Sequence, residues 1–316
     1  MAIRISHLSH SYGKRQALTD LSLEIQRGET FVFLGPNGGG KTTLFRVLST
    51  LVPLQTGEVF LAGFDLRRDV KQIRARIGVV FQAPSLDKKL TVAENIRHQA
   101  ALYGVSGKLL RDRESELLEQ FGLTDRRRER TETLSGGLRR RVELAKGMVH
   151  HPELLLMDEP STGLDPGARI DLWQTLNELK ERFGVTVVMT SHLLEEADKA
   201  DRIAILDRGS LVALDTPDAL RATVGGDSIT IESDDANALA TDIRERFQFA
   251  ADVVDGNVRL EQASGHELIA RLVEAFPGRI QSIRLGKPTL EDVFIAKTGH
   301  RFWQSSKEGE ESNANE

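Results

Sequence analysis

The amino-acid sequence predicts an α/β domain with a mixed sheet at its core, followed by a smaller α+β domain. Three observations lead to this prediction. The apolar run Thr30–Leu34 has the length of a buried strand and leads into a glycine-rich loop that precedes a helical pattern. Further along, other apolar runs of strand length end in polar side chains, as buried parallel strands do at a binding edge. Beyond Gly225-Gly226, shorter strand and helix patterns alternate in the order β-α-β-β-α-β.

Composition narrows the class of protein. The chain has 316 residues, a formal net charge of −5 and no cysteine. The length suits one domain of about 200 residues and a second, smaller one. Without cysteine there is no disulfide framework, thiol chemistry or cysteine-based metal site, and the negative charge argues against non-specific nucleic-acid binding. The N-terminus lacks the apolar core of a signal peptide, and no apolar run approaches the roughly 20 residues of a membrane span. We therefore expect a cytoplasmic enzyme with no nucleic-acid partner.

The segment before the first buried strand contains two short runs of alternating polarity, Ile3–Ile5 and Leu21–Ile25, which predict β-strands. Tyr12 lies in the turn between them. Taken alone, such a tyrosine is more often structural. Because a glycine-rich loop follows, we interpret Tyr12 as a stacking platform for a nucleotide base, an interaction worth about 1–3 kcal/mol that discriminates little between bases.

The glycine-rich loop is the strongest signal in the chain. Its residues are Gly35, Pro36, Asn37, Gly38, Gly39, Gly40, Lys41, Thr42 and Thr43. They match the pattern G-x-x-x-x-G-K-[ST] between a strand and a helix, which is the context that this pattern requires. Glycines let successive backbone N–H groups point at one anion, and the helix N-terminus adds about half a positive charge. We expect Lys41 to reach the β- and γ-phosphates of a nucleoside triphosphate and the Thr42 hydroxyl to bind Mg²⁺.

Two more strands and a helical region follow the loop. Gly57–Gly63 predicts a short strand bounded by glycines, and Ile77–Gln82 predicts another that ends in a polar residue. The Gln82 amide can approach Mg²⁺ or an attacking water, although a lone glutamine at a strand end is usually only a turn residue. Residues 91–150 indicate a helical subdomain, which begins with Thr91 as an N-cap and Glu94 three residues later.

A second anion site is indicated at Leu134-Ser135-Gly136-Gly137, where a long helix begins. The serine hydroxyl and the first N–H groups of the helix face outward, and the two glycines have no side chains that would shield these groups from a ligand. Taken alone, this pattern is a serine-capped helix with a flexible entry. In a chain that already carries a phosphate loop, we interpret Ser135, Gly136 and Gly137 as a second phosphate-facing helix end.

Two acidic residues end the apolar strand pattern Glu153–Glu159. Ligands of parallel sheets bind at the carboxyl ends of the strands, so Asp158 and Glu159 are expected beside the phosphates. Asp158 suits a Mg²⁺ anchor, and Glu159 suits a general base that activates water. The less favoured alternative is that the two acids are only polar residues that face solvent at the end of the strand.

The next segment repeats the pattern of a strand with a polar end. Ser161–Pro166 predicts a turn, and apolar residues near three- and four-residue spacing predict a helix after it. Val185–His192 predicts a buried strand whose terminal residue, His192, can hydrogen-bond a γ-phosphate. A lone histidine at a strand end is more often structural, but this strand repeats the pattern of the others. Asp207–Ser210 then predicts a hairpin turn between two strands.

Taken together, residues 1 to about 220 resemble the nucleotide-binding subunit of an ATP-binding cassette (ABC) transporter. This family has a P-loop NTPase fold with an antiparallel β subdomain and a helical subdomain. The phosphate loop alone is shared by many ATPases and GTPases, whereas the Leu-Ser-Gly-Gly sequence shortly before the carboxylate strand is specific to ABC cassettes. The resemblance rests on these residues in this order: Tyr12, Gly35–Thr43, Gln82, Leu134–Gly137, Leu154–Glu159, Ser161–Asp165 and His192.

This resemblance implies ATP and Mg²⁺ as cofactors and a second cassette as a partner, with a homodimer expected. Two cassettes enclose two ATP molecules head to tail, so that the phosphate loop of one chain meets the Ser135–Gly137 segment of the other. Glu159 activates the water, His192 holds the γ-phosphate, and Asp165 communicates across the dimer.

The resemblance also implies a multi-span membrane permease, because no span is evident in this sequence. Gln82 couples the ATP site to that partner, whose helices dock beside the helical subdomain, on the cytoplasmic face of the inner or plasma membrane. With Thr42 and Asp158, Gln82 also supplies the Mg²⁺ ligands. One residue departs from the family pattern, since Leu138 stands where these cassettes usually carry glutamine. The serine and backbone N–H groups make most phosphate contacts, so we expect binding to survive.

The region after Gly225-Gly226 predicts a small ferredoxin-like domain at about residues 227–300, following a cassette at 1–222. It carries no catalytic constellation. Its segment Thr289–Phe294 resembles the C-terminal appendage of exporter ATPases of the daunorubicin-resistance (ABC-2) type, for which regulation, dimer contact and membrane-partner docking are the alternative roles. Residues 301–316 are polar and acidic, and we expect them to form a disordered tail.

These features predict an ATPase subunit that powers export through a separate membrane protein. A soluble ABC ATPase of translation or DNA repair is the main alternative. The translation type usually joins two cassettes and the repair type inserts a long coiled coil, whereas this chain has one cassette and no heptad run. An importer ATPase is a third alternative, which the C-terminal resemblance disfavours.

Overall fold

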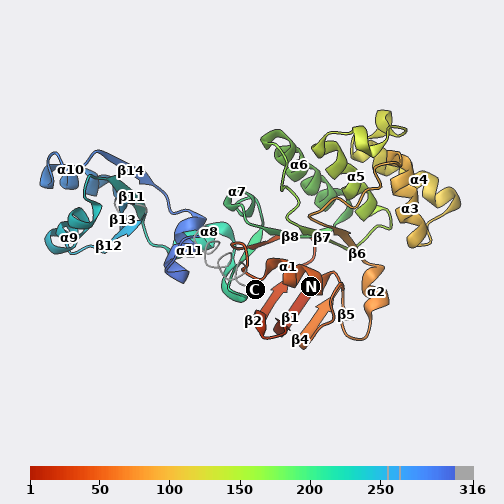
Figure 1. The fold of residues 1–316 in the computed structure, drawn as a ribbon, viewed down its shortest axis with the longest axis horizontal. Helices are drawn as coiled ribbons and strands as arrows, with labels where there is room; N and C mark the ends of the chain where they lie inside the picture. Colours follow the sequence, from red (N-terminus) through yellow and green to blue (C-terminus); the bar gives the residue numbers. More distant parts are fainter. Residues whose placement is uncertain (255, 263–264, 303–316) are drawn as a thin grey trace. The chain divides into compact units, whose positions relative to one another are not determined.

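The computed structural model describes residues 1–302 except 255 and 263–264. Figure 1 shows two compact units in the described chain, Met1–Leu214 and Asp215–Phe302. Each unit has its own hydrophobic core. The polar tail expected at residues 301–316 lies outside the described residues from 303 onward.

A six-stranded sheet forms the centre of the first unit, in the order β10-β9-β3-β8-β7-β6. Its strands are β3 (Thr30–Leu34), β6 (Ile77–Val80), β7 (Leu154–Asp158), β8 (Thr186–Ser191), β9 (Arg202–Asp207) and β10 (Ser210–Asp215). The pairings among β9, β3, β8, β7 and β6 are all parallel. β3, β7 and β8 are buried along their whole length, because helices lie on both faces of the sheet (Figure 1).

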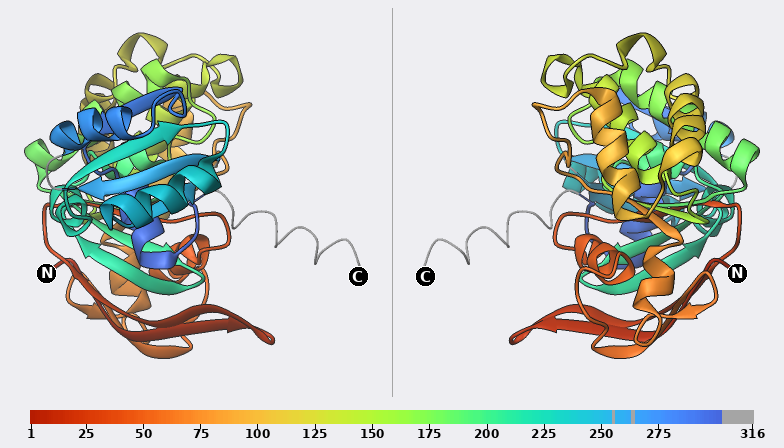
Figure 2. Two further views of the ribbon diagram at one scale, coloured as in Figure 1. Left: turned by 90° about the vertical axis from the view of Figure 1, so that its left-hand side faces the viewer. Right: turned by 90° about the vertical axis from the view of Figure 1, so that its right-hand side faces the viewer.

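A second, antiparallel sheet belongs to the same unit, in the order β2-β1-β4-β5. Its strands are β1 (Ile3–Tyr12), β2 (Arg15–Ile25), β4 (Thr56–Leu61) and β5 (Phe64–Asp65). β1 and β2 are longer than the sequence predicted, because bulges break the alternation of polarity in β1. Figure 2 shows the two strands as a long ribbon that ends in a hairpin. Leu44 and Leu48 of helix α1 (Lys41–Leu48) share one core with Ile3 and Phe31 of the two sheets.

Helices form the rest of the first unit. They are α2 (Val70–Arg74), α3 (Val92–Leu102), α4 (Gly107–Gln120), α5 (Gly136–Met148), α6 (Pro166–Phe183) and α7 (Leu194–Ala197), with 3-10 turns at Thr124–Arg126 and Thr131–Thr133. α3, α4 and α5 lie where the sequence predicted a helical subdomain. Thr91 caps α3 as predicted: its hydroxyl accepts the N–H of Glu94, and the Glu94 carboxylate accepts the N–H of Thr91 at 2.8 Å.

The second unit contains an antiparallel sheet in the order β12-β13-β11-β14. Its elements are β11 (Asp227–Glu232), α9 (Ala236–Phe247), β12 (Ala251–Val254), β13 (Asn257–Gln262), α10 (Gly265–Ala275) and β14 (Ser282–Gly286). This β-α-β-β-α-β arrangement is the ferredoxin-like fold that the sequence predicted. Side chains of α9 and α10 share one core with Ile229, Ile231 and Leu260, so the two helices cover the same face of the sheet (Figure 2).

Two further helices, α8 (Pro217–Thr223) and α11 (Leu290–Thr298), pack against each other in the second unit. The cassette predicted from the sequence ends at residue 222, and α8 was not predicted. The second unit begins earlier, at Asp215, because α8 packs with α11. Contact between segments so far apart in the chain leaves no local pattern in the sequence. No helix of the described chain is long and apolar enough to span a membrane.

Candidate functional site

The phosphate loop joins β3 to α1 and is shaped by glycines. Gly38 and Gly40 have φ values of 81° and 98°, in the left-handed region that favours glycine. A Cβ atom at Gly40 would lie 2.8 Å from the carbonyl oxygen of Ala17, and one at Gly35 would lie 2.4 Å from that of Leu206. Gly40 is also the N-cap of α1 and has no side chain to offer the first N–H groups of the helix. Those N–H groups are therefore left to bind an anion.

Lys41, the first residue of α1, is buried in the loop, with 4% of its surface exposed. Its Nζ atom donates hydrogen bonds to the carbonyl oxygens of Gly35 and Pro36, at 2.8 and 3.0 Å. Oε1 of Glu159 lies 3.5 Å from the same Nζ atom. Burial lowers the pKa of Lys41, and the negative charge of Glu159 opposes that shift. The amino group is thus held inside the loop that is shaped to receive a phosphate.

The two acidic residues at the end of β7 are oriented by one threonine. Asp158 is buried, and its Oδ1 atom accepts a hydrogen bond from the Thr190 hydroxyl of β8 at 2.5 Å. The backbone N–H of Glu159 donates to the same hydroxyl at 3.0 Å. Burial raises the pKa of Asp158, and the hydrogen bond from Thr190 opposes the rise. Glu159 has a φ of 42°, a left-handed conformation that costs such a residue roughly 1–3 kcal/mol and is concentrated at functional sites.

The Glu159 carboxylate is the meeting point of three polar side chains. Its Oε2 atom lies 3.1 Å from Nδ1 of His192, and 3.3 Å from both the amide nitrogen of Gln82 and Oγ1 of Thr162. The contact with His192 is the main cause that holds the pKa of Glu159 below its usual value, while burial opposes this effect. The carboxylate is therefore ionised at neutral pH, as a base that accepts a proton from water must be.

An open cleft of about 540 Å³ lies beside these groups. Tyr12 belongs to its wall and is 43% exposed, so much of its ring is accessible to a ligand. Eight predicted site residues line the cleft: Tyr12, Asn37, Gly38, Gly40, Lys41, Thr42, Thr43 and Glu159. The cleft therefore runs from the tyrosine to the phosphate loop and the acidic strand end.

Two cations of the cleft wall, Arg15 and Arg208, were not predicted from the sequence. Arg15 pairs with Tyr12 across the β1–β2 hairpin, so a predicted hairpin register would have found it. Arg208 lies in the turn between β9 and β10, where the N–H of Gly209 donates to the carbonyl oxygen of Gly39 at 3.1 Å. This contact and the parallel pairing of β9 with β3 bring Arg208 to the phosphate loop, and the sequence carries no local signal for them.

Ser135 lies in a separate hollow of about 400 Å³. Its hydroxyl accepts a hydrogen bond from the N–H of Leu138 at 3.3 Å, as the N-cap of α5. Gly137 and Asp165 line the same hollow, and Asp165 caps α6 by accepting the N–H of Ala168 at 2.9 Å. Among the described residues, the hollow and the cleft have no lining residue in common. Ser135 and Asp165 therefore do not line the cleft that contains the phosphate loop.

The residues expected to hold Mg²⁺ offer hard oxygen donors: the Thr42 hydroxyl, the Gln82 amide oxygen and the Asp158 carboxylate. Mg²⁺ in nucleotide sites usually takes one or two protein carboxylates, waters and oxygens of the substrate phosphates. In the part of the chain that the structure describes, no group of three or more His, Cys, Asp or Glu side chains could hold a metal ion. One carboxylate, one hydroxyl and one amide oxygen, completed by phosphate oxygens and waters, match the usual Mg²⁺ pattern, so the donor set fits an ion that binds together with a nucleotide.

Comparison with known proteins identifies the family. Residues 18–162 match the ABC transporter family, and residues 216–298 match the C-terminal domain of DrrA1-3-like ATP-binding proteins. A daunorubicin resistance ATP-binding protein of Streptomyces coeruleorubidus is 38% identical over 313 residues, which cover 95% of this chain and 96% of that protein. This chain belongs to the ATP-binding proteins of ABC transporters.

Further comparisons agree with the assignment to the ABC ATP-binding proteins. A linearmycin resistance ATP-binding protein of Bacillus subtilis strain 168 is 34% identical, and the match covers 94% of this chain and 98% of that protein. An ATP-binding cassette solved as a dimer in a post-hydrolysis state, bound to ADP and Pi, matches with a TM-score of 0.61 at 28% identity. That match covers 68% of this chain and 98% of the other. The predicted fold, family and ATPase activity are confirmed.

Proposed function

We propose that this ABC ATPase powers export through a separate membrane subunit, as a dimer of two identical cassettes on the cytoplasmic face of the membrane. Relatives that match it over almost their whole length are named for resistance to daunorubicin and to linearmycin. Resistance of this kind is consistent with outward transport of the compound. The C-terminal domain, of the type found in DrrA1-3-like proteins, agrees with the same class.

The observation that carries the proposal is the separation of two anion-binding helix ends within one chain. The cleft contains Lys41 and the N-terminus of α1, whereas the hollow contains Ser135 and the N-terminus of α5. A second cassette in head-to-tail orientation would present its Ser135 to the γ-phosphate of an ATP in this cleft. Asp165, which lines the same hollow as Ser135, would then lie at the contact between cassettes. ATP binding and dimerisation become one event, because each ATP needs both chains.

Within the cleft, Glu159 acts as the general base and accepts a proton from the attacking water. His192 holds this carboxylate and faces the γ-phosphate, and Gln82 orients the water through its amide. Mg²⁺ held by Thr42, Gln82 and Asp158 would neutralise charge on the phosphates. The turn at Glu159 supports this assignment, since its strained backbone places the carboxylate between Gln82 and His192.

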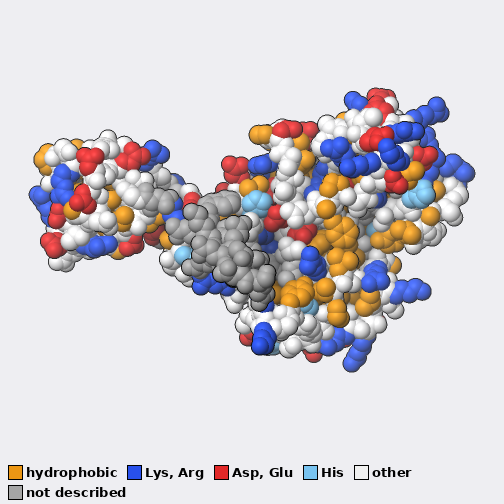
Figure 3. All heavy atoms as spheres, viewed as in Figure 1, with side chains coloured by type: hydrophobic (Ala, Val, Ile, Leu, Met, Phe, Trp, Pro, Cys, Tyr) orange, Lys and Arg blue, Asp and Glu red, His pale blue; other side chains and the backbone are white. Residues whose placement is uncertain are grey.

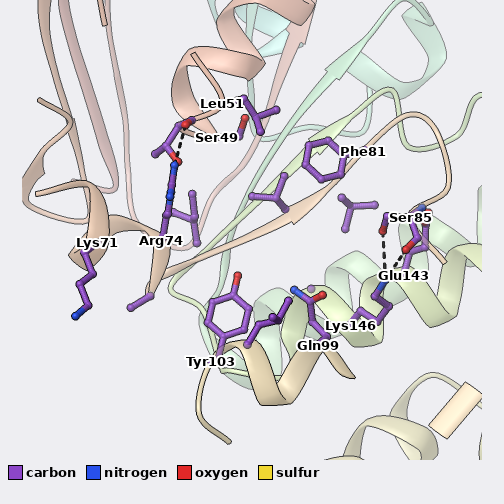
Figure 4. A pocket seen from close by; sticks show the side chains of 17 residues that line it. Ser49, Leu51, Lys71, Arg74, Phe81, Ser85, Gln99, Tyr103, Glu143 and Lys146 are labelled. Atoms are coloured by element: carbon purple, nitrogen blue, oxygen red, sulfur yellow. Dashed lines mark hydrogen bonds between the residues drawn. The ribbon is translucent and has the colours of Figure 1, made fainter. Parts of the chain in front are cut away.

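A groove of about 740 Å³ on the first unit suits the membrane subunit. It is bordered by α2, β6, α3 and α5 (Figure 4). Phe81, which directly precedes Gln82, lines it, and Leu51 and Leu102 are 56% and 80% exposed at its edge. Figure 3 shows apolar side chains gathered between the helical region and the sheet of β1, β4 and β5. A segment seated in this groove would touch the chain next to Gln82 and so sense the nucleotide site.

The charge of the groove indicates the chemistry of the segment that binds there. Lys71, Arg74 and Lys146 belong to its lining, and Glu143 is the one acidic residue among the described lining residues. We infer that the membrane subunit inserts an amphipathic cytoplasmic helix with apolar side chains toward Leu102 and at least one carboxylate toward the basic residues.

Purification of variant complexes tests this function. The full-length chain with Glu159→Gln, isolated with ATP from detergent-solubilised cells of the source organism, is expected to retain a multi-span membrane protein in stoichiometric yield, identified by mass spectrometry. Adding Leu102→Asp places a charge in the apolar groove and should remove that protein. Leu109→Asp is the matched control, because Leu109 is 50% exposed on α4 and lies outside the described lining of the groove.

The other outcomes point to other functions. Recovery with soluble partners alone, or with ribosomes, would overturn export and favour a role in translation or DNA repair. A substrate-binding protein in the complex would favour import. If Leu102→Asp and Leu109→Asp both keep the membrane protein, the groove is not its docking surface.

A further inference from the structure

A buried ion pair on α5 has no part in the nucleotide contacts described above. Arg140 and Glu143, which lie one helical turn apart, are 6% and 5% exposed, and Nη1 of the arginine lies 2.8 Å from Oε2 of the glutamate. Burial lowers the pKa of Arg140, and the Glu143 carboxylate opposes that shift. Removing two charges from water is costly, so the other contacts of this arginine decide what the pair contributes.

The Arg140 guanidinium contacts two segments of the active site at once. Its Nε atom donates to the carbonyl oxygen of Pro160 at 2.6 Å, and Nη1 donates to that of Phe81 at 3.0 Å. Pro160 directly follows Glu159 in the chain, and Phe81 directly precedes Gln82. One side chain of α5 therefore holds the backbone beside both the proposed base and the amide that contacts it.

A weaker, purely electrostatic influence on Arg140 comes from the segment that follows His192. The negative charge of Glu196 favours the charged form of Arg140. Glu196 is 3% exposed, and its Oε2 atom accepts a hydrogen bond from the Ser191 hydroxyl at 2.5 Å. Ser191 directly precedes His192. Arg140 is therefore hydrogen-bonded beside Glu159 and Gln82, whereas its interaction with the segment of His192 is electrostatic only.

The same face of α5 holds the segment after Gln82 on the groove side. Glu143 accepts the N–H of Ser85 at 2.5 Å, and Nζ of Lys146 donates to the carbonyl oxygen of Ser85 at 2.7 Å (Figure 4). Arg140, Glu143 and Lys146 follow one another at three-residue spacing, so they lie on one side of the helix. Both ends of the segment that contains Gln82 are therefore attached to α5, the helix that Ser135 caps.

We propose that Arg140 is a positioning residue for ATP hydrolysis, which holds the segments of Gln82 and Glu159 against α5 so that these two side chains meet. The inference rests on Glu159 as the general base. A guanidinium suits this task because its donors point in fixed directions, so two carbonyl groups are held at a set spacing. A lysine ammonium on a flexible stem keeps the charge but not this geometry.

Arg140→Lys in the full-length chain tests the proposal. This substitution leaves a positive charge beside Glu143 but removes the planar guanidinium, whose donors point in fixed directions. We expect kcat for ATP hydrolysis to fall roughly 10- to 100-fold, as a displacement of about 1 Å at a catalytic centre can cause. The Kd for ATP should stay within about twofold of the wild-type value, because the phosphate loop is unchanged. The acid limb of kcat/KM should move to higher pH, because a displaced Glu159 loses the contact with His192 that lowers its pKa.

A double variant, Arg140→Met with Glu143→Leu, provides a second test. Replacing a buried ion pair by apolar side chains of similar volume is often neutral or stabilising. In this variant the carbonyl groups of Phe81 and Pro160 and the N–H of Ser85 also lose their partners, which opposes that gain. We therefore expect a folded variant with a lower Tm that shows the same loss of kcat well below its Tm, whereas a purely stabilising role would leave kcat unchanged there. Arg139→Lys is the matched control. Arg139 directly precedes Arg140 on α5, and it is outside the described contacts of Phe81 and Pro160.

Three results would overturn the positioning role: wild-type kcat in Arg140→Lys, wild-type kcat in a folded double variant, or a loss of ATP affinity as large as the loss of kcat. Glu159→Gln, assayed alongside, separates this inference from the function on which it rests. If Glu159→Gln hydrolyses ATP at the wild-type rate, the assignment of the base fails, whatever Arg140 does.

Discussion

Nδ1 of His192 lies 3.1 Å from Oε2 of Glu159, across the ends of the neighbouring parallel strands β8 and β7. This contact favours the ionised carboxylate and is the main cause of its lowered pKa. The histidine therefore controls the charge of the proposed base, in addition to its expected contact with the γ-phosphate. The pairing of β7 with β8 sets the distance on which the first of these effects depends.

Glu159→Gln should lower kcat by roughly 10²–10⁴, because an amide cannot accept the proton of the attacking water. ATP binding should persist, since Lys41 and the phosphate loop are unchanged. Phosphate release measures the first effect, and titration with ATP measures the second. Turnover near the wild-type rate would place the general base elsewhere in the chain.

His192→Ala should move the acid limb of kcat/KM to higher pH. The contact with His192 favours the charged form of Glu159, so its removal raises the pKa of Glu159 and leaves less ionised base at acidic pH. A pH profile of kcat/KM, which reports groups of the free enzyme, measures the shift. Thr162→Ala is the matched control, because the Thr162 hydroxyl contributes less to the same pKa. An equal or larger shift in that control would contradict the prediction.

Ser135→Arg should block ATP-driven dimerisation, because it adds bulk and charge in the hollow that is proposed to cover the second nucleotide. Size-exclusion chromatography with Mg²⁺-free ATP, in which hydrolysis is suppressed, measures the dimer. Ser106→Arg is a suitable control, since Ser106 is an exposed N-cap residue of α4 on the same helical subdomain. A normal dimer of the Ser135 variant would refute the head-to-tail arrangement.

Gly209→Ala should destabilise the protein and weaken ATP binding. A Cβ atom at Gly209 would lie 2.5 Å from the carbonyl oxygen of Ala17, and such overpacking costs about 1–3 kcal/mol of unfolding free energy. Weaker ATP binding follows because Gly209 donates its N–H to Gly39 of the phosphate loop.

A second glycine separates the close contact from backbone strain. Gly63 has a φ of +86°, close to the +80° of Gly209, but a Cβ atom there would meet no described atom within 4 Å. Gly63→Ala should therefore cost only the left-handed conformation, roughly 1–2 kcal/mol, and leave ATP affinity unchanged. Urea unfolding and ATP titration of both variants make the comparison. Equal losses of stability would show that the contact with Ala17 is unimportant.

Much of the fold was predictable because it depends on short stretches of sequence. β7 and β8 were predicted from continuous apolar runs, which buried parallel strands require. The phosphate loop was equally evident, since its glycines and Lys41 act within one consecutive segment. β1 was predicted too short, because bulges interrupt its alternation. α8 was missed, because the packing partner that accounts for its place in the second unit, α11, lies far along the chain.

Arg140 shows why part of the site could not be predicted. In the sequence it is the middle one of three consecutive arginines in a helical pattern, and its neighbours Arg139 and Arg141 look the same. Its burial and its two carbonyl partners appear only once α5 packs beside the ends of β6 and β7. Arg208 was missed for the same reason, since the turn that carries it reaches the cleft through a contact with Gly39.

The sequence by itself determined the chemistry of this protein: a nucleotide-binding loop, the order of the cassette motifs and an appended ferredoxin-like domain. These features depend on residue type and spacing over short distances, where backbone geometry is nearly constant. Only the tertiary structure decided which side chains act together. It unites Gln82 and His192 at Glu159 and separates Ser135 from the cleft. The physical reason is that distances between remote residues follow from strand order and helix packing, which depend on interactions summed over the whole fold.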